Sequence, residues 1–239
     1  MDLIKKLLFY ISVPKCVFCG ERLNYGELPL CNECIKSYID VKARDCSKCG
    51  KQLSRCKCSN TYLKAHYVKD LVKVYKYMGR GDEQFASNHL IFSLKRDNRR
   101  DVVDFLKNEI VNAIHNSIKV NSDFVITSVP RRRVAIIHYG YDHAKVLANA
   151  VAKELGIKFI SPLKSNSTQA QKGKHGQERM KNASFSYRRD INLKGKTVLL
   201  LDDVVTTGAS MGACATLLKG LDAKRVIGVC IATAFKDNA

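Results

Sequence analysis

Apolar residues recur at helical spacing in three segments of the chain. Residues 101–118 (DVVDFLKNEIVNAIHNSI) carry apolar side chains every three or four positions, which predicts an amphipathic helix. Residues 142–155 show the same period. Residues 210–220 predict a third helix, with small side chains.

Short β-rich or continuously apolar runs lie between these segments. Residues 124–129 predict a strand that Pro130 closes with a turn, and residues 197–201 predict a fully apolar strand. Residues 158–160 predict an edge strand, and residues 226–234 a last apolar strand. Strands that alternate with helices in this way predict an α/β fold, with a parallel sheet covered by helices on both faces.

The cysteines divide the chain into two parts. Eight of the ten lie between positions 16 and 58, whereas Cys214 and Cys230 stand alone in apolar surroundings and read as core thiols. Paired thiolates at this spacing favour zinc over disulfides, and two such pairs complete a tetrahedron. We therefore expect a cysteine-rich zinc-binding module over residues 1–60, ahead of a larger domain over residues 61–239. The four close pairs are Cys16 and Cys19, Cys31 and Cys34, Cys46 and Cys49, and Cys56 and Cys58.

The natural grouping of these pairs is sequential, so that the first two pairs form one site and the last two form another. An interleaved grouping remains open, because Cys56 and Cys58 are separated by a single residue. No open ligand position is evident, so the sites read as structural. Metal binding would fold a segment that is too small for a core of its own.

Positive charge is the main feature of the composition, with a formal net charge of +19. It indicates either a solvated surface or an anionic partner such as nucleic acid or a phosphorylated small molecule. Basic residues gather in residues 131–133 and 164–189, and the second segment includes a polar stretch, residues 165–177, that predicts a mobile loop. The apolar run at residues 7–13 is too short for a bilayer, which needs about 20 residues, and no cleavage site follows it. A cytoplasmic protein without a membrane span is expected.

The stretch VLLLDDVVTTGAS, residues 198–210, carries the candidate chemistry. Asp202 and Asp203 follow the apolar strand, at the edge where open parallel sheets bind ligands. The small, hydroxyl-rich turn behind them leads into a helix, and its N–H groups make a cradle for a phosphate. The carboxylates would then accept hydrogen bonds from sugar hydroxyls. Helix capping by an acidic residue is the plainer alternative, but capping needs only one carboxylate.

This stretch resembles the motif by which type I phosphoribosyltransferases bind phosphoribosyl pyrophosphate (PRPP). Together with the cysteine-rich segment, it makes the chain similar to the ComF family of competence proteins over essentially its full length. Residues 140–144 (GYDHA) stand where that family usually has Gly-Phe-Asn-Gln-Ala, so His143 replaces a glutamine. Further matches are residues 91–95 (IFSLK), Gln171, Arg179, Asn182 and Phe185.

The resemblance implies a site that works with Mg²⁺. Asp202 and Asp203 would hold the ribose, the turn after them the 5′-phosphate, and the turn after the second strand the pyrophosphate. Arg131 to Arg133 bunch directly after Pro130, whereas the family spreads basic residues toward the glycine. The implied PRPP residues are Asp202 and Asp203 for the ribose, Thr206, Thr207, Gly208, Ala209 and Ser210 for the 5′-phosphate, and Pro130, Arg131 and Arg132 for the pyrophosphate.

Two functions remain open. In the first, the protein is a DNA-uptake factor that binds PRPP and single-stranded DNA beside a helicase-like competence ATPase, the partner that the resemblance implies. Its DNA contacts are expected in the basic loop, at Lys172, Lys174 and Arg179. In the second, it is an active phosphoribosyltransferase with an unknown acceptor. A third and weaker alternative, a PRPP-sensing regulator, lacks a helix-turn-helix signal.

Overall fold

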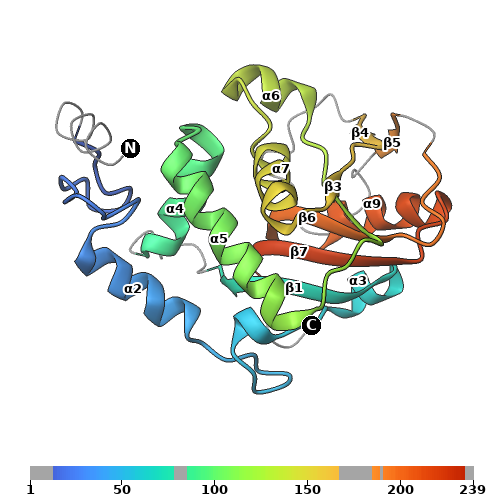
Figure 1. Cartoon of the computed structure of the whole chain (residues 1–239), viewed down its shortest axis with the longest axis horizontal. Helices are drawn as coiled ribbons and strands as arrows, with labels where there is room; N and C mark the ends of the chain where they lie inside the picture. Colours follow the sequence, from blue (N-terminus) through green and yellow to red (C-terminus); the bar gives the residue numbers. More distant parts are fainter. Residues whose placement is uncertain (1–12, 78–84, 167–184, 189–190, 235–239) are drawn as a thin grey trace.

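A five-stranded parallel sheet forms the centre of the computed structural model (Figure 1). The structure describes residues 13–77, 85–166, 185–188 and 191–234. The strand order is β1-β7-β6-β2-β3, and every neighbouring pair is parallel. The strands are β1 (Val68–Lys76), β2 (Phe124–Ser128), β3 (Lys158–Phe159), β6 (Thr197–Val205) and β7 (Arg225–Thr233).

Helices cover both faces of this sheet, as the sequence predicts. One face packs against α2, α4, α5 and α7, and the other packs against α3 and α9. Among the described residues, no helix combines the length and the apolar character that a membrane crossing requires. The helices are α2 (Asn32–Lys42), α3 (Thr61–Ala65), α4 (Ala86–Arg96), α5 (Arg100–Ser117), α6 (Arg133–Tyr139), α7 (His143–Leu155) and α9 (Ala209–Gly220), with a short 3₁₀ helix η1 (Leu53–Arg55).

Strand β6 is longer than the sequence pattern indicates. It continues to Val205, four positions past the expected end at Leu201, and stays paired with β7 throughout. Side chains of a strand alternate between its faces. Val198 and Leu200 accordingly join the core below α9, whereas Leu199 joins the core below α4, α5 and α7. The two aspartates that follow therefore belong to opposite faces of the sheet.

Several elements were not expected from the sequence. The strand β1 carries three lysines among its nine residues, which obscures its apolar pattern. Helix α2 buries only three side chains, and helix α4 begins beside residues outside the described part of the chain. A two-stranded antiparallel sheet joins β4 (Leu163–Ser165) to β5 (Phe185–Tyr187). Most of the expected basic loop, including Lys172, Lys174 and Arg179, lies outside the described residues.

The cysteine-rich segment packs into the same core as one face of the sheet. Tyr38 of α2 is 2% exposed and meets the rings of Tyr75 and Phe105 edge-on, at centroid distances of 5.7 and 5.2 Å. Its hydroxyl donates to Glu109, 2.5 Å away, and Glu109 also pairs with Lys42 at 2.6 Å. These contacts join α2 to β1 and α5. A domain boundary after residue 60 stays a prediction.

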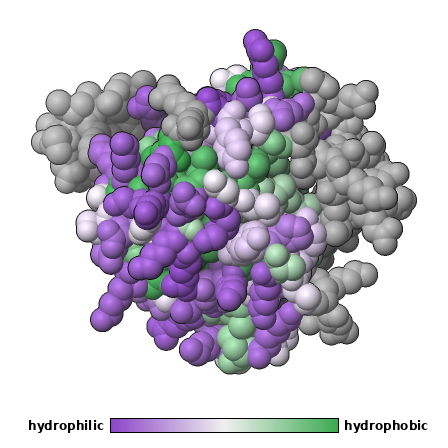
Figure 2. All heavy atoms as spheres, turned by 90° about the vertical axis from the view of Figure 1, so that its right-hand side faces the viewer, coloured by the Kyte–Doolittle hydropathy of each residue, from purple (hydrophilic) through white to green (hydrophobic). Residues whose placement is uncertain are grey.

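The face of the molecule near α3 and α9 is mainly hydrophilic. Figure 2 shows hydrophobic residues there in smaller groups among hydrophilic ones. Basic side chains occur at the amino ends of β1 and β7, where Arg225 pairs with Asp70. This distribution fits the high positive charge of the chain.

Candidate functional site

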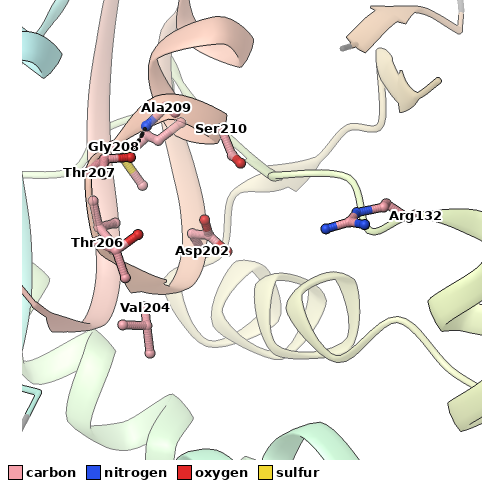
Figure 3. A pocket seen from close by; sticks show the side chains of 10 residues that line it. Arg132, Asp202, Val204, Thr206, Thr207, Gly208, Ala209 and Ser210 are labelled. Carbon is pink, nitrogen blue, oxygen red and sulfur yellow. Dashed lines mark hydrogen bonds between the residues drawn. The ribbon is translucent and has the colours of Figure 1, made fainter. Parts of the chain in front are cut away.

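A cavity of about 220 Å³ lies where β6 turns into α9 (Figure 3). It is bounded by the carboxyl end of the strand, by the turn after it and, on the opposite side, by an arginine from the loop between β2 and α6. The sequence predicts a phosphate cradle in this turn. The residues that line the cavity are Arg132, Asp202, Val204, Val205, Thr206, Thr207, Gly208, Ala209, Ser210 and Met211.

The turn owes its shape to a glycine. Gly208 precedes α9 with a φ of +87°, a conformation that side chains disfavour. A Cβ at this position would also lie 2.7 Å from Cγ of Leu63, so α3 packs directly against the turn. The Thr207 hydroxyl accepts from the Ala209 N–H at 3.3 Å. The N–H groups at the start of α9 carry partial positive charge, which suits an anion.

The side chain of Asn60 stabilises this turn and links it to α3. Its Nδ2 donates to the carbonyl oxygen of Thr207 at 3.2 Å, and its Oδ1 caps α3 by accepting from the Leu63 N–H at 2.8 Å. Asn60 follows the last cysteine pair by two positions. The cysteine-rich segment thus contacts the candidate phosphate site, which the sequence did not indicate.

Asp202 is the carboxylate that faces the cavity. Its side chain and the guanidinium of Arg132 point toward one another across the cavity in Figure 3. Burial, together with the negative charge of Asp203, raises the pKa of Asp202 well above its usual value. A hydrogen-bond donor or cation in the cavity would stabilise the ionised form of Asp202.

Asp203 lies on the other face of β6 and does not line the cavity. Its Oδ2 is 3.0 Å from Nζ of Lys95 on α4 and 2.6 Å from Nε2 of His143 on α7. Burial alone would raise the pKa of Asp203, but Lys95 and His143 outweigh it and hold this pKa below its ordinary value. The carboxylate is therefore ionised, and it ties two helices to the strand.

The two partners of Asp203 come from segments that the sequence analysis singled out only by resemblance. Lys95 ends the IFSLK stretch, and His143 stands at the glutamine position of the family pattern. The Asp203 charge also raises the pKa of Lys95, although burial opposes this rise. Because β6 continues through Asp203, the alternation of side chains along a strand places Asp203 and Asp202 on opposite faces; an expected strand end at Leu201 hides this signal.

The three arginines after β2 are directed differently. Arg132 lines the cavity, whereas Arg133 begins α6. The Arg131 guanidinium lies 4.6 Å from the ring centroid of Tyr139 and donates to the carbonyl oxygen of Tyr141 at 3.3 Å. Pro130 precedes them at the end of the strand. Of the residues expected on the pyrophosphate side, Arg132 lines the same cavity as Asp202, whereas Arg131 contacts the backbone after α6.

The eight clustered cysteines form two groups of four, in the sequential grouping. Within each group the sulfur atoms lie within 4.8 Å of one another. Zinc–sulfur bonds of about 2.3 Å in a tetrahedron separate sulfurs by about 3.8 Å. The Sγ atoms of Cys19 and Cys31 are 3.8 Å apart, and those of Cys49 and Cys56 are 3.6 Å apart. Each group could therefore hold a metal ion.

The thiols within each group differ in acidity. Burial raises the pKa of a thiol, but N–H groups of Cys19, Cys31 and Phe18 lower that of Cys16 to about 7. Backbone and thiol donors likewise lower the pKa of Cys46 to about 7 against the effect of burial. Burial raises that of Cys56 to about 12. A bound cation would draw off the remaining protons, because the thiolate is the ligand.

The chain is similar to known proteins in its phosphoribosyltransferase-like part and over most of its length. Residues 142–238 match the phosphoribosyl transferase domain family. The chain is 21% identical over 225 residues to competence protein ComFC of Streptococcus pneumoniae, covering 89% of this chain and 96% of that one. It is 24% identical over 217 residues to DNA utilization protein YhgH of Escherichia coli K12, covering 87% and 92%. These similarities confirm the resemblance to the ComF family.

Solved structures that match this chain include an enzyme of purine biosynthesis and an adenine phosphoribosyltransferase. The allosteric regulatory enzyme of purine biosynthesis matches with a TM-score of 0.38 and 18% identity, over 59% of this chain and 30% of that enzyme. Adenine phosphoribosyltransferase from Leishmania donovani matches with a TM-score of 0.36 and 17% identity, over 57% and 54%.

Proposed function

We propose that the protein is a cytoplasmic DNA-uptake protein that binds PRPP and single-stranded DNA. The chain is ComF-like over most of its length and carries a phosphoribosyltransferase domain, which supports this proposal. The observation that carries the PRPP part is the cavity itself, where Asp202 and Arg132 face each other beside the turn over residues 206–210. The relatives named for competence and DNA utilization support the DNA-uptake part. A helicase-like ATPase is the partner that the family resemblance implies.

PRPP would lie across the cavity with its two charged ends apart. The hydroxyls of Thr206, Thr207 and Ser210 and the N–H groups at the start of α9 would donate to the 5′-phosphate. Asp202 would accept from the ribose hydroxyls. Arg132, on the opposite side, would stabilise the pyrophosphate, since a guanidinium matches phosphate oxygens in a bidentate fashion. Asp203 would hold the strand that presents Asp202, through its contacts with Lys95 and His143.

The oxygen-rich lining also suits Mg²⁺. Asp202 offers a carboxylate and the turn offers hydroxyls, which are the hard ligands that Mg²⁺ prefers. Asp202 would hold the ion together with oxygens of PRPP. Bound there, Mg²⁺ would neutralise charge on the pyrophosphate.

A thermal-shift measurement tests this proposal. A ligand that binds only the folded state raises its melting temperature. We expect PRPP with Mg²⁺ to raise the melting temperature of the full chain, and to lose this effect in Asp202→Ala. Asp104→Ala, an exposed aspartate on α5, is the control and keeps the shift. An equal shift in Asp202→Ala would contradict the proposal.

The two cysteine groups would each hold one zinc ion in a structural role. Four thiolates fill a tetrahedron and leave no position for water or substrate. The second group lies just before Asn60, the residue that holds the phosphate turn. Zinc would therefore support both the fold of the N-terminal segment and the position of the turn.

Single-stranded DNA would contact the basic residues after β4, Lys172, Lys174 and Arg179, which lie outside the described part of the chain. Each phosphate contact releases counterions, so affinity falls with salt with a log–log slope of about −0.7 per contact. Titration of a fluorescent oligothymidine at several salt concentrations tests this assignment. Replacement of Lys172 and Lys174 by glutamine should flatten the slope, and an unchanged slope would assign these lysines to a solvated surface.

An active phosphoribosyltransferase with an unknown acceptor is the second candidate. The position of Arg132 opposite Asp202 favours it, because charge on departing pyrophosphate could be stabilised there. Incubation with PRPP, Mg²⁺ and a panel of nucleobases, followed by a pyrophosphate assay, separates the two. Release with one base supports turnover, whereas binding without release supports the first candidate.

A further inference from the structure

A second cavity, of about 280 Å³, lies between the second cysteine group and the carboxyl ends of β1 and β7. Lys76 and Thr233 are the last residues of these two paired strands, and both line it. Ligands of open parallel sheets bind at this edge.

The charge of this lining is positive. Among the described residues, it contains four cationic side chains, Arg44, Lys48, Lys73 and Lys76, and one carboxylate, that of Asp45. Four thiolates around a divalent metal would add two negative charges to the neighbouring group. The lining stays positive even then, which favours an anion.

Lys73 is the most buried of these cationic side chains. It is 4% exposed, and its Nζ donates to the carbonyl oxygens of Cys58 at 2.7 Å and Leu71 at 3.3 Å. An ammonium group has three donors, and these two bonds use two of them. No salt bridge to Lys73 occurs among the described residues. The charge of Lys73 acts on the nearby Cys56 thiol, so the cysteine group supplies part of the compensation that a buried ammonium needs, and the third donor stays available to a ligand.

The hydroxyl of Ser59 is a second group in this cavity that could donate to a ligand. This residue is 3% exposed, lines the same cavity, and its Oγ has no hydrogen-bond partner among the described residues. A buried hydroxyl without a partner is costly. Ser59 and Lys73 therefore place a hydroxyl and an ammonium donor in the wall of the same cavity.

We propose that this cavity binds a phosphoryl group, at a site separate from the cavity beside Asp202. Lys73 and Ser59 donate from within, and Lys76 adds a second ammonium from the end of β1. Asn60 lines this cavity and also donates to Thr207, so the two sites adjoin through one side chain. The phosphoryl group comes either from a single-stranded DNA backbone or from a free phosphate compound.

The test follows backbone amide signals of the full, isotope-labelled chain by NMR. Inorganic pyrophosphate and a short oligothymidine are titrated separately. We expect at least one of them to shift the amides of Ser59 and Lys76 in a saturable way. Thr207 and Gly208 report on the other cavity in the same spectra, so failure of one site is distinguishable from failure of the other.

Two variants and one control make the assignment specific. Lys76→Gln removes a charge-assisted contact and should weaken the binding that these amides report by about tenfold. Ser59→Ala removes a hydroxyl without a partner, so the fold is retained, and should weaken it by about fivefold. Lys153→Gln, an exposed lysine on α7, changes the net charge equally and should leave it unchanged.

The outcomes separate the sources of the phosphoryl group. Saturable shifts with oligothymidine alone identify a DNA backbone, and shifts with pyrophosphate alone identify a free phosphate compound. Shifts with both support the site as well. Absence of saturable shifts at Ser59 and Lys76 with either probe would overturn the proposal. Shifts that both variants leave unchanged would overturn it equally.

Discussion

Nε2 of His143 lies 2.6 Å from Oδ2 of Asp203, and Nζ of Lys95 lies 3.0 Å from the same oxygen. One buried carboxylate thus joins α7 and α4 to β6. The next side chain back along that strand, Asp202, lines the candidate PRPP cavity. The position of Asp202 therefore depends on contacts made on the opposite face of the sheet.

Replacement of Asp203 by asparagine should destabilise the protein. The change removes the anion that Lys95, whose side chain is 33% exposed, and His143 share, and loss of a hydrogen bond to a charged group costs about 1.5–3 kcal/mol. Because the pKa of Asp203 is held below its ordinary value, this contribution is complete above about pH 4 and is lost as the pH falls further. Urea unfolding at pH 7 measures this loss, which should shrink below about pH 4. Asp104→Asn is the exposed control, and an equally small effect in both variants would contradict the result.

His143 should tolerate the residue that the family usually carries. A glutamine amide can donate to Asp203 as the imidazole does, so His143→Gln should change the free energy of unfolding by less than about 1 kcal/mol. His143→Ala removes the donor and leaves a cavity, so it should cost about 2–4 kcal/mol. Denaturant unfolding of both variants checks the order. Equal losses would show that the hydrogen bond to Asp203 contributes little.

Gly208→Ala should disturb the phosphate turn specifically. A non-glycine residue in the left-handed region costs about 1–2 kcal/mol, and the new methyl group would also meet Leu63. Gly156→Ala is the matched control, since it has a φ of +66° and nothing within 4 Å of its added Cβ. We expect both to lose stability but only Gly208→Ala to lose PRPP affinity, by about tenfold or more. Equal PRPP affinity in the two variants would show that the turn does not contribute to PRPP binding.

Two zinc ions per chain are expected by elemental analysis of the reduced protein. Cys58→Ser should lower the content to one, whereas Cys214→Ala, a buried thiol of α9, should keep two. Zinc displaces protons from thiols, and the pKa values of Cys16 and Cys46 are about 7. Other thiols of the groups, such as Cys56, have a raised pKa, so zinc affinity should fall throughout this range as the pH drops and more steeply below 7, and a chromogenic chelator should remove zinc faster at pH 5.5 than at pH 7.5. A chain without zinc at neutral pH would contradict the assignment.

The sequence predicts the parallel sheet, the edge strand β3 and the sequential cysteine groups, because apolar period and thiol spacing are local signals. It does not predict the end of β6, since its pattern turns polar at Asp202 while pairing with β7 continues to Val205. The separation of Asp202 from Asp203 follows from that extension. Contacts such as Asn60 with Thr207, 147 residues apart, leave no local pattern. They arise only when the cysteine-rich segment packs on the sheet.

Calorimetric titration of PRPP, with Mg²⁺, into the wild type and Asp202→Ala tests the central claim most directly, with Asp104→Ala as the folded control. If Asp202 accepts the ribose hydroxyls, the wild type and the control bind with one site per chain. Asp202→Ala then loses affinity by about a hundredfold or more, since a charged acceptor of two hydrogen bonds is removed. Equal affinity in Asp202→Ala and the wild type would contradict the placement of PRPP in this cavity.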